Sequence, residues 1–248
     1  MAEIEEVTIY GSNKWSDLKP VDLSKIQKVS WDRYNPDVYE KNQIVLHHTV
    51  SGDSIRGDLI TWKKYKSNIA TCIIIERNGT IKQLFSSKYW AYHLGTGNYS
   101  LDKHSIAIEL DNWGGLILGD GKEHKFGKNV DGTPRMKKTI DGKYYATYSN
   151  VVVDVPVTYY KDGFRGYDYF ESYTDEQIRA TGELLLLWHN RYNIPLTYNE
   201  EMWDLSERAL NGDKGVWTHV SFRKPSDKQD CHPDPNLISM LRTIASLV

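Results

Sequence analysis

Cysteine and net charge are both scarce in this sequence. Its 248 residues include only two cysteines, Cys72 and Cys231. Two cysteines cannot form a disulfide framework, so the composition does not require an oxidising compartment. The 31 basic and 33 acidic residues leave a formal net charge of −2. Nucleic-acid-binding proteins usually carry a basic surplus, so we expect no nucleic-acid partner.

Long apolar segments are also missing. The most apolar run, Leu184–Trp188, is far too short to cross a bilayer, so we expect no membrane partner. Residues 1–15 contain neither the basic start nor the apolar centre of a signal peptide. We therefore expect a protein without a signal peptide that is made in the cytoplasm. Any target outside the cell would then be reached by lysis or by dedicated export.

Phenylalanine is rare, whereas tyrosine and tryptophan are abundant. The chain has five Phe, 17 Tyr and eight Trp. Aromatic rings that carry a polar atom suit a wet binding surface as well as the edge of a core. The length allows one large domain or two small ones. No repeat or linker divides the sequence, so we predict a single domain over residues 1–248, present as a monomer.

Short apolar runs alternate with amphipathic segments, and this order predicts an α/β fold. The expected architecture is a central mixed β-sheet flanked by helices. A capping box at Thr174 and Gln177 begins the clearest helix. Asn78 and Gly79 predict a two-residue hairpin turn. The predicted strands are 43–48, 70–77, 80–85 and 105–110, and the predicted helices are 54–66, 175–191 and 235–247.

Two stretches do not follow this alternation. Residues 1–40 form an expected N-terminal arm with at most a short strand near Val7–Tyr10. Between residues 112 and 172, glycine-rich turns separate pieces rich in tyrosine and valine, such as Tyr144–Tyr148 and Val151–Tyr160. This pattern is typical of antiparallel hairpins. We therefore predict a Tyr-rich β-hairpin insertion at 112–172.

His47 and His48 end the first predicted strand. Successive residues of a strand point to opposite faces, so at most one of the two faces a given site while the strand stays regular. A His-His pair by itself is equally typical of a structural or surface position.

Glu109 lies near the end of the predicted strand 105–110. Ser105, Ala107 and Glu109 share one face of that strand, and the aliphatic residues share the other. A carboxylate on a face of small residues can line a cleft with a raised pKa, as a general base requires. The alternative is a solvent-exposed glutamate at a strand end.

The segment 218–233 concentrates polar residues in a loop before the last helix. His219, Asp230 and Cys231 lie in it, and Lys228 stands two residues before Asp230, on the same side of an extended backbone. A histidine with a nearby carboxylate or thiolate, joined by a distant histidine, is a typical catalytic zinc ligand set. A polar surface loop would have a similar composition.

Five of these motifs, taken in order, resemble a known family. They are LHHT at 46–49, IIIERNGTI at 73–81, WAYHLG at 90–95, SIAIEL at 105–110, and TH…KQD across 218–230. The series is similar to the zinc-dependent N-acetylmuramoyl-L-alanine amidases, the amidase-2 group that includes phage amidases, muropeptide-recycling amidases and peptidoglycan recognition proteins. The similarity covers about residues 40–110 and 174–248, and the order of five motifs is far more specific than any one of them.

The resemblance implies a Zn²⁺ cofactor and its ligands. His47 matches the first zinc histidine, and His219 matches the second. The family pattern Lys-x-ligand makes Asp230 the third ligand, because Asp230 keeps the two-residue step from Lys228. Cys231 is the alternative, since zinc binds thiolates well and other members use cysteine there.

The resemblance also implies the other functional residues. Glu109 matches a catalytic glutamate of the recycling amidases, and Lys228 would stabilise the oxyanion. Where some members have a catalytic tyrosine this sequence has Thr71, a departure that shifts the role of base to Glu109. His93 matches a histidine that lines the substrate site, and we expect Trp90 and Tyr92 to pack beside sugar or peptide groups of the substrate. His48, His104, His124, His189 and His232 have no implied role, although His232 could support the metal site.

The implied activity is hydrolysis of the amide between N-acetylmuramic acid and L-alanine of the stem peptide, with bacterial peptidoglycan or muropeptides as the partner. The lack of a signal peptide fits a phage lysin, a recycling enzyme or an exported effector, and the insertion favours the phage lysin because it enlarges the site. A peptidoglycan-binding module without catalysis is the main competing hypothesis. A third is a Tyr-rich structural or receptor-binding phage component.

Overall fold

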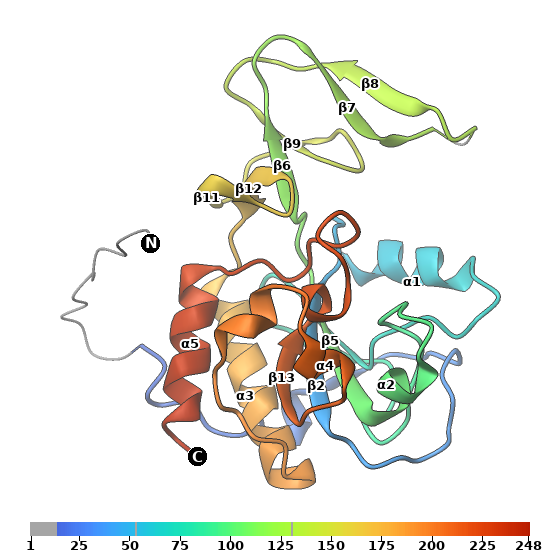
Figure 1. Ribbon diagram of the computed structural model, residues 1–248, viewed down its shortest axis with the longest axis vertical. Coiled ribbons are helices and arrows are strands. Elements are labelled where there is room, and N and C mark those ends of the chain that lie inside the picture. The colour runs from blue at the N-terminus through green and yellow to red at the C-terminus, as the bar shows by residue number, and fades with distance from the viewer. Residues whose placement is uncertain (1–13, 53, 130) are drawn as a thin grey trace.

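A six-stranded mixed sheet forms the centre of the protein. The structure is a computed structural model that describes residues 14–52, 54–129 and 131–248 (Figure 1). The strand order in the sheet is β1-β4-β3-β5-β2-β13. The strands are β1 (Gln27–Lys28), β2 (Gln43–His48), β3 (Ile73–Ile75), β4 (Ile81–Gln83), β5 (Ser105–Leu110) and β13 (Gly215–Thr218).

Three of these strands run parallel and end together. β2 pairs with β5 on one side and with β13 on the other, and every residue of the three strands is buried. Strands that are covered on both faces have nearly continuous apolar sequences, as in QIVL of β2 and SIAI of β5. The register places His47 opposite Glu109. Parallel strands bring their carboxyl ends to one edge, so the polar residues at these ends gather there.

The predicted hairpin between the third and fourth strands is present but shorter than expected. Only Ile73–Ile75 and Ile81–Gln83 pair, instead of residues 70–77 and 80–85. The turn spans residues 76–80, and the Glu76 amide donates to the Thr80 carbonyl across the base of this turn. Gly79 has a φ of +78°, which glycine adopts without strain.

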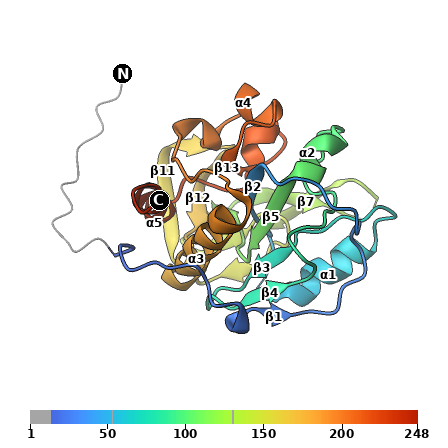
Figure 2. The ribbon, with the colours of Figure 1, turned by 90° about the horizontal axis from the view of Figure 1, so that it is seen from below.

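Helices cover both faces of the central sheet. α3 (Asp175–Tyr192) lies beside α5 (Pro235–Ala245) on one face, and α1 (Ile55–Lys63) lies on the other, as Figure 2 shows. A six-residue helix, α2 (Tyr99–His104), leads into β5, and α4 (Glu207–Leu210) precedes β13. Two short 3-10 helices, η2 (Glu200–Trp203) and η3 (His219–Phe222), lie near β13.

The helix ends follow the local chemistry of the sequence. The Thr174–Gln177 capping box is formed as predicted at the start of α3. Ser54 caps α1, and that helix ends at Lys63 rather than near residue 66. On α1, Ile60 is 49% exposed, whereas Asp58 is buried. α5 ends two residues earlier than predicted.

The described residues between 115 and 171 form a second, antiparallel sheet and a separate hairpin. The strand order in the second sheet is β10-β9-β6-β12-β11, and β7 pairs with β8. The second sheet lies at the carboxyl-end edge of the central sheet, and the β7–β8 hairpin lies beyond the second sheet (Figure 1). The strands are β6 (Gly115–Leu118), β7 (Glu123–Lys128), β8 (Pro134–Lys138), β9 (Tyr144–Ala146), β10 (Val152–Val153), β11 (Val157–Phe164) and β12 (Tyr167–Glu171).

Two arginines attach the second sheet to the core. The Arg77 guanidinium contacts Glu171 of β12 at 2.7 Å and Asp111 at 3.0 Å. Arg165, in the turn between β11 and β12, donates to the Val220 carbonyl of η3. Both carboxylate partners of Arg77 are buried, so this contact is shielded from solvent.

The N-terminal segment packs against the core. The Val21 amide donates to the Glu183 carbonyl of α3, and Trp15 and Leu18 are buried. η1 (Leu23–Lys25) precedes β1, which extends the central sheet by pairing with β4. The strand predicted near Val7–Tyr10 lies outside the described residues. Within the described part of the chain, no helix has the length and apolar character that would carry it across a membrane.

Candidate metal centre

His47 is held on β2, where neighbouring strands cover it on both sides. Its side chain is 3% exposed. The pleat sends His47 and His48 to opposite faces, as expected. His47 lines a cavity of about 190 Å³ at the carboxyl ends of the strands, and its Nδ1 lies 4.0 Å from Glu109 Oε2.

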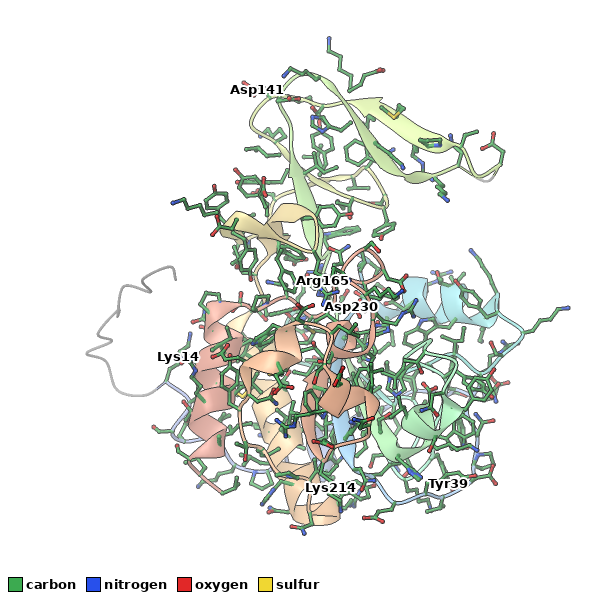
Figure 3. All side chains as sticks on the ribbon, viewed as in Figure 1. Lys14, Tyr39, Asp141, Arg165, Lys214 and Asp230 are labelled. Carbon is green, nitrogen blue, oxygen red and sulfur yellow. The ribbon has the colours of Figure 1, made fainter. Side chains whose placement is uncertain are left out.

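His219 and Asp230 approach His47 from the segment after β13. His219 is the first residue of η3, and the Val220 amide donates to the Asp230 carbonyl, which holds the returning chain beside the 3-10 helix. Figure 3 shows Asp230 at this edge of the core, close to Arg165 of the second sheet. Residues 172 positions apart in the sequence thus reach one point.

The three side chains converge on a single position. His47 Nδ1 lies 3.0 Å from His219 Nδ1, and Asp230 Oδ2 lies 2.8 Å from His219 Nδ1 and 3.3 Å from His47 Nδ1. All three residues are buried. Bonds of about 2.0–2.2 Å from a tetrahedral zinc ion place its ligand atoms at comparable separations.

A backbone carbonyl sets the tautomer of His219. Its Nε2 lies 3.0 Å from the Leu94 carbonyl oxygen, which can only accept. Nε2 therefore carries the hydrogen, and the lone pair of Nδ1 points toward Asp230. This arrangement is typical of metal-binding histidines, whose second nitrogen donates to a fixed oxygen.

A chain of three side chains sets the tautomer of His47. The Ser105 hydroxyl donates to the Leu101 carbonyl at 2.7 Å, so its oxygen accepts from His93 Nε2 at 2.8 Å. His93 Nδ1 then carries no hydrogen and accepts a hydrogen bond from His47 Nε2 at 3.0 Å. His47 Nδ1 keeps its lone pair. Two imidazole lone pairs and a carboxylate oxygen therefore meet, and a divalent cation satisfies all three.

Charge and burial agree with a cation site. Burial, together with the neighbouring His219, lowers the pKa of His47 to about 4. Burial by itself would raise the pKa of Asp230, but the two histidines outweigh it and hold that pKa well below its usual range. Neutral imidazoles and an ionised carboxylate are the forms that bind metal.

Cys231 is not directed toward these ligands. Its side chain is fully buried, and its thiol contacts the Tyr173 hydroxyl inside the apolar core. Burial raises the pKa of this thiol well above its ordinary value, which keeps it protonated and a poor ligand. Among the described residues, the group able to hold a metal is His47, His219 and Asp230.

Glu109 is the unpaired carboxylate of the cavity. Its Oε2 is buried and accepts no hydrogen bond from the protein. Burial, followed by the nearby Asp230 and Asp58, raises its pKa well above the usual value, and Lys228 opposes this shift. A bound cation would lower the pKa again by direct attraction.

The other expected site residues divide into two groups. Lys228, Thr71, Tyr92 and His93 line the cavity with the three candidate ligands, whereas Trp90 is buried beside Tyr92, outside the cavity lining. Both ring nitrogens of His93 are engaged inside the protein, by His47 and Ser105. The Thr71 hydroxyl donates to the Ile73 carbonyl.

Several residues of the site were not expected from the sequence. Ser105 and Leu94 set the two tautomers, and Trp62 and Val50 line the cavity. Ser105 had a usable signal, since it shares the strand face of Glu109. Leu94 acts through its backbone carbonyl, and a backbone contact cannot be predicted from the type of residue that makes it.

His48 and His232 belong to a buried cluster around Tyr173, and His48 also lines the cavity. His48 Nδ1 lies 2.9 Å from the Tyr173 hydroxyl, and the His232 ring stacks on Tyr173 and Phe170. His232 also contacts the Glu171 carbonyl through Nε2. It packs the second sheet onto the core and does not touch the three candidate ligands.

Fold and site together define an α/β protein in which three buried side chains able to hold a metal lie at the carboxyl ends of a mixed sheet. Residues 37–235 match the family model described as N-acetylmuramoyl-L-alanine amidase. The chain therefore belongs to the N-acetylmuramoyl-L-alanine amidase family, as the ordered motifs predicted. No curated protein sequence matches the chain.

Solved structures with a similar course of the chain are distant in sequence. A selenomethionine derivative of AmpD is 14% identical, covers 91% of this chain and 98% of its own, and has a TM-score of 0.47. The endolysin N-acetylmuramoyl-L-alanine amidase LysCS from Clostridium intestinale is 13% identical, with coverages of 84% and 88% and a TM-score of 0.43. Drosophila peptidoglycan recognition protein SA is 11% identical, with 86% of each chain covered and a TM-score of 0.42.

Proposed function

We propose that this protein is a zinc-dependent N-acetylmuramoyl-L-alanine amidase that hydrolyses the amide between N-acetylmuramic acid and L-alanine in peptidoglycan. The observation that carries the proposal is the convergence of His47, His219 and Asp230 beside the unpaired carboxylate of Glu109. Three protein ligands leave a fourth position free for water or substrate, which is the pattern of catalytic rather than structural zinc.

The residues around the proposed zinc site have different roles in hydrolysis. A zinc ion held by the three ligands would polarise the scissile carbonyl and make a water acidic enough to attack near neutral pH. Glu109 accepts the proton of the attacking water and delivers it to the leaving amine nitrogen as the C–N bond breaks. Lys228 stabilises the negative charge that develops on the carbonyl oxygen, an effect worth about 3 kcal/mol for one donor elsewhere.

A second candidate is a recognition module that binds muropeptides without cleaving them. Family membership allows both functions. The complete ligand set and a buried carboxylate next to it favour catalysis, because binding by itself does not require an unpaired buried acid.

We further propose that the protein is a phage lysin that reaches the wall after lysis, with residues 112–172 inserted into the amidase core. In this proposal the second sheet enlarges the substrate site, whereas a site for small peptidoglycan fragments would need no such extension.

The test uses defined peptidoglycans and mass spectrometry of the products. Wild-type protein should release free stem peptides beginning with L-alanine, lose this activity with a chelator, and regain it when zinc is restored. Glu109→Gln should bind one zinc per chain but cleave about 10²- to 10⁴-fold more slowly.

Two results would contradict the proposal. Full activity of Glu109→Gln would remove Glu109 as the base. Tight binding of muropeptides by zinc-loaded wild type, with no product at any time, would establish the recognition function instead.

A further inference from the structure

The second sheet has a largely uncharged face opposite the one that packs on His232. Strand register places Tyr159, Tyr169, Leu116 and Ala146 in one row across β11, β12, β6 and β9. A second row contains Leu118, Tyr144 and Val153. We call these seven residues, with Val157 and the adjoining Trp113, the outer face. None of these nine side chains is charged.

The opposite face of the same sheet is already occupied. Phe170, which alternates with Tyr169 along β12, stacks on His232 with ring centroids 4.7 Å apart. Tyr160, the neighbour of Tyr159, contacts the same histidine at 2.8 Å. The outer face is attached to the core at one end, where Glu171, the register partner of Val157, is paired with Arg77.

Three tyrosines form a ladder along the exposed part of the outer face. The ring centroids of Tyr144 and Tyr169 are 5.4 Å apart, and those of Tyr169 and Tyr159 are 5.2 Å apart. Tyr159 is 59% exposed, and the other two are half-buried. The planes of the first pair are inclined at 60° and those of the second at 34°, so the three rings together offer a stepped apolar surface with hydroxyls at its edge.

Trp113 connects the outer face to the mouth of the metal cavity. On one side its indole packs against Leu116, Ala146 and Val153. On the other side it lies so close to Gly52 that an added Cβ there would be 3.0 Å from the ring. Gly52 belongs to the loop whose Thr49 and Val50 line the cavity. A polymer that leaves the cavity along this loop therefore reaches the outer face.

We propose that the tyrosine ladder of the outer face binds the glycan strand of the substrate, on sugars beyond the one whose amide is cleaved. This inference rests on the proposed amidase function and names the part of the polymer that the second sheet would hold. A stepped aromatic surface of this kind suits pyranose rings, whose C–H faces are apolar and whose edges carry hydroxyls. The uncharged side chains of the ladder suit neutral N-acetylated sugars better than the charged stem peptide.

The first experiment measures binding without catalysis. Isothermal titration of the zinc-loaded protein with a β-1,4-linked tetramer of N-acetylglucosamine should show a single site. The probe contains no muramoyl–alanine amide, so it is not hydrolysed by the proposed activity. Tyr159→Ala should weaken binding about three- to tenfold, as expected for the loss of one aromatic contact, and Tyr159→Trp should keep it.

A matched control comes from the same region of the chain. Tyr148 is 56% exposed and lies beside Gly127 of β7 rather than in the rows of the outer face, so Tyr148→Ala should bind the tetramer like wild type. Circular dichroism should confirm that both alanine variants are folded. Absence of tetramer binding by wild type, or equal affinity of Tyr159→Ala and wild type, would overturn the proposal.

The second experiment separates this inference from the proposed function. Tyr159→Ala should cleave a single-sugar muramoyl peptide at the wild-type rate and should show a raised KM only on long glycan strands. If wild type cleaves neither substrate, the amidase proposal fails while the tetramer still tests the ladder. If the variant loses activity equally on both substrates, the ladder does not act on the glycan.

Discussion

His47 Nε2 lies 3.0 Å from His93 Nδ1, and the opposite nitrogen of His93 is held by the Ser105 hydroxyl. Because Ser105 donates to a backbone carbonyl, every hydrogen in this series has one allowed position. The buried series keeps His47 in the tautomer that presents Nδ1 to a metal.

Removal of the serine hydroxyl should therefore weaken metal binding. We expect Ser105→Ala to lower zinc affinity about tenfold, within the range of about 10–100-fold seen when such outer partners are lost. Competition with a chromophoric chelator measures this affinity independently of activity. Long-range ¹H–¹⁵N spectra of the metal-free protein should show the Nε2–H tautomer of His47 in wild type and a mixture in the variant.

Ser87→Ala is the matched control, because Ser87 is also a buried serine but bonds to Tyr192 away from the site. Equal zinc affinities of Ser105→Ala and Ser87→Ala would mean that Ser105 only fills space.

The identity of the third ligand can be tested by two substitutions. Asp230→Asn removes the charge of a carboxylate that contacts both histidines, and should reduce zinc binding at least tenfold. Cys231→Ala should keep one zinc per chain and cost about 1–2 kcal/mol of stability from lost core packing. Elemental analysis and thermal unfolding provide the two readouts. Loss of zinc from Cys231→Ala with retention in Asp230→Asn would reverse the assignment.

The attachment of the second sheet depends on Glu171. Its carboxylate accepts two hydrogen bonds from the Arg77 guanidinium while both groups are shielded from solvent. Glu171→Gln leaves the largely buried Arg77 guanidinium without one of its negatively charged partners. The substitution should lower the free energy of unfolding by about 3 kcal/mol in a denaturant titration.

Glu200→Gln breaks an ion pair with Arg242 that is mostly exposed, and should change stability by less than about 1 kcal/mol. If the two variants lose similar stability, burial does not strengthen the Arg77–Glu171 contact.

Lys41 makes stability depend on pH in the alkaline range. Its ammonium is buried and donates to the carbonyls of Lys103 and Ser105, and burial lowers its pKa from 10.5 to about 8. Between pH 8 and 10.5 the unfolded chain binds this proton more tightly than the folded chain. The titration of Lys41 therefore increases the free energy of unfolding as the pH rises from about 8 to 10.5.

Lys41→Met removes the titrating group. The stability of wild type relative to this variant should be constant below about pH 8 and should increase toward pH 10.5. Denaturant titrations of both proteins at several pH values provide the comparison. A difference that stays flat from pH 7 to 10.5 would show that Lys41 titrates normally in the folded state.

Much of the fold follows from local sequence. The strands β2 and β5 are set by apolar runs, and α3 begins at a capping box whose two members lie three residues apart. These signals act between near neighbours, through backbone geometry and short-range hydrogen bonds. The ordered motifs likewise identified the family and nominated His47, His219 and Asp230 together.

Only the tertiary structure decided between neighbouring candidates. The pleat shows that His47 and His48 diverge, but the packing of β13 and η3 decides that His47 meets His219. The same packing turns Asp230 to the cavity and Cys231 into the core. His93 became a partner of His47, and the tyrosine-rich stretch became a continuous sheet. The physical reason is that these contacts join segments far apart in the chain, and their geometry depends on how whole elements pack rather than on residue type.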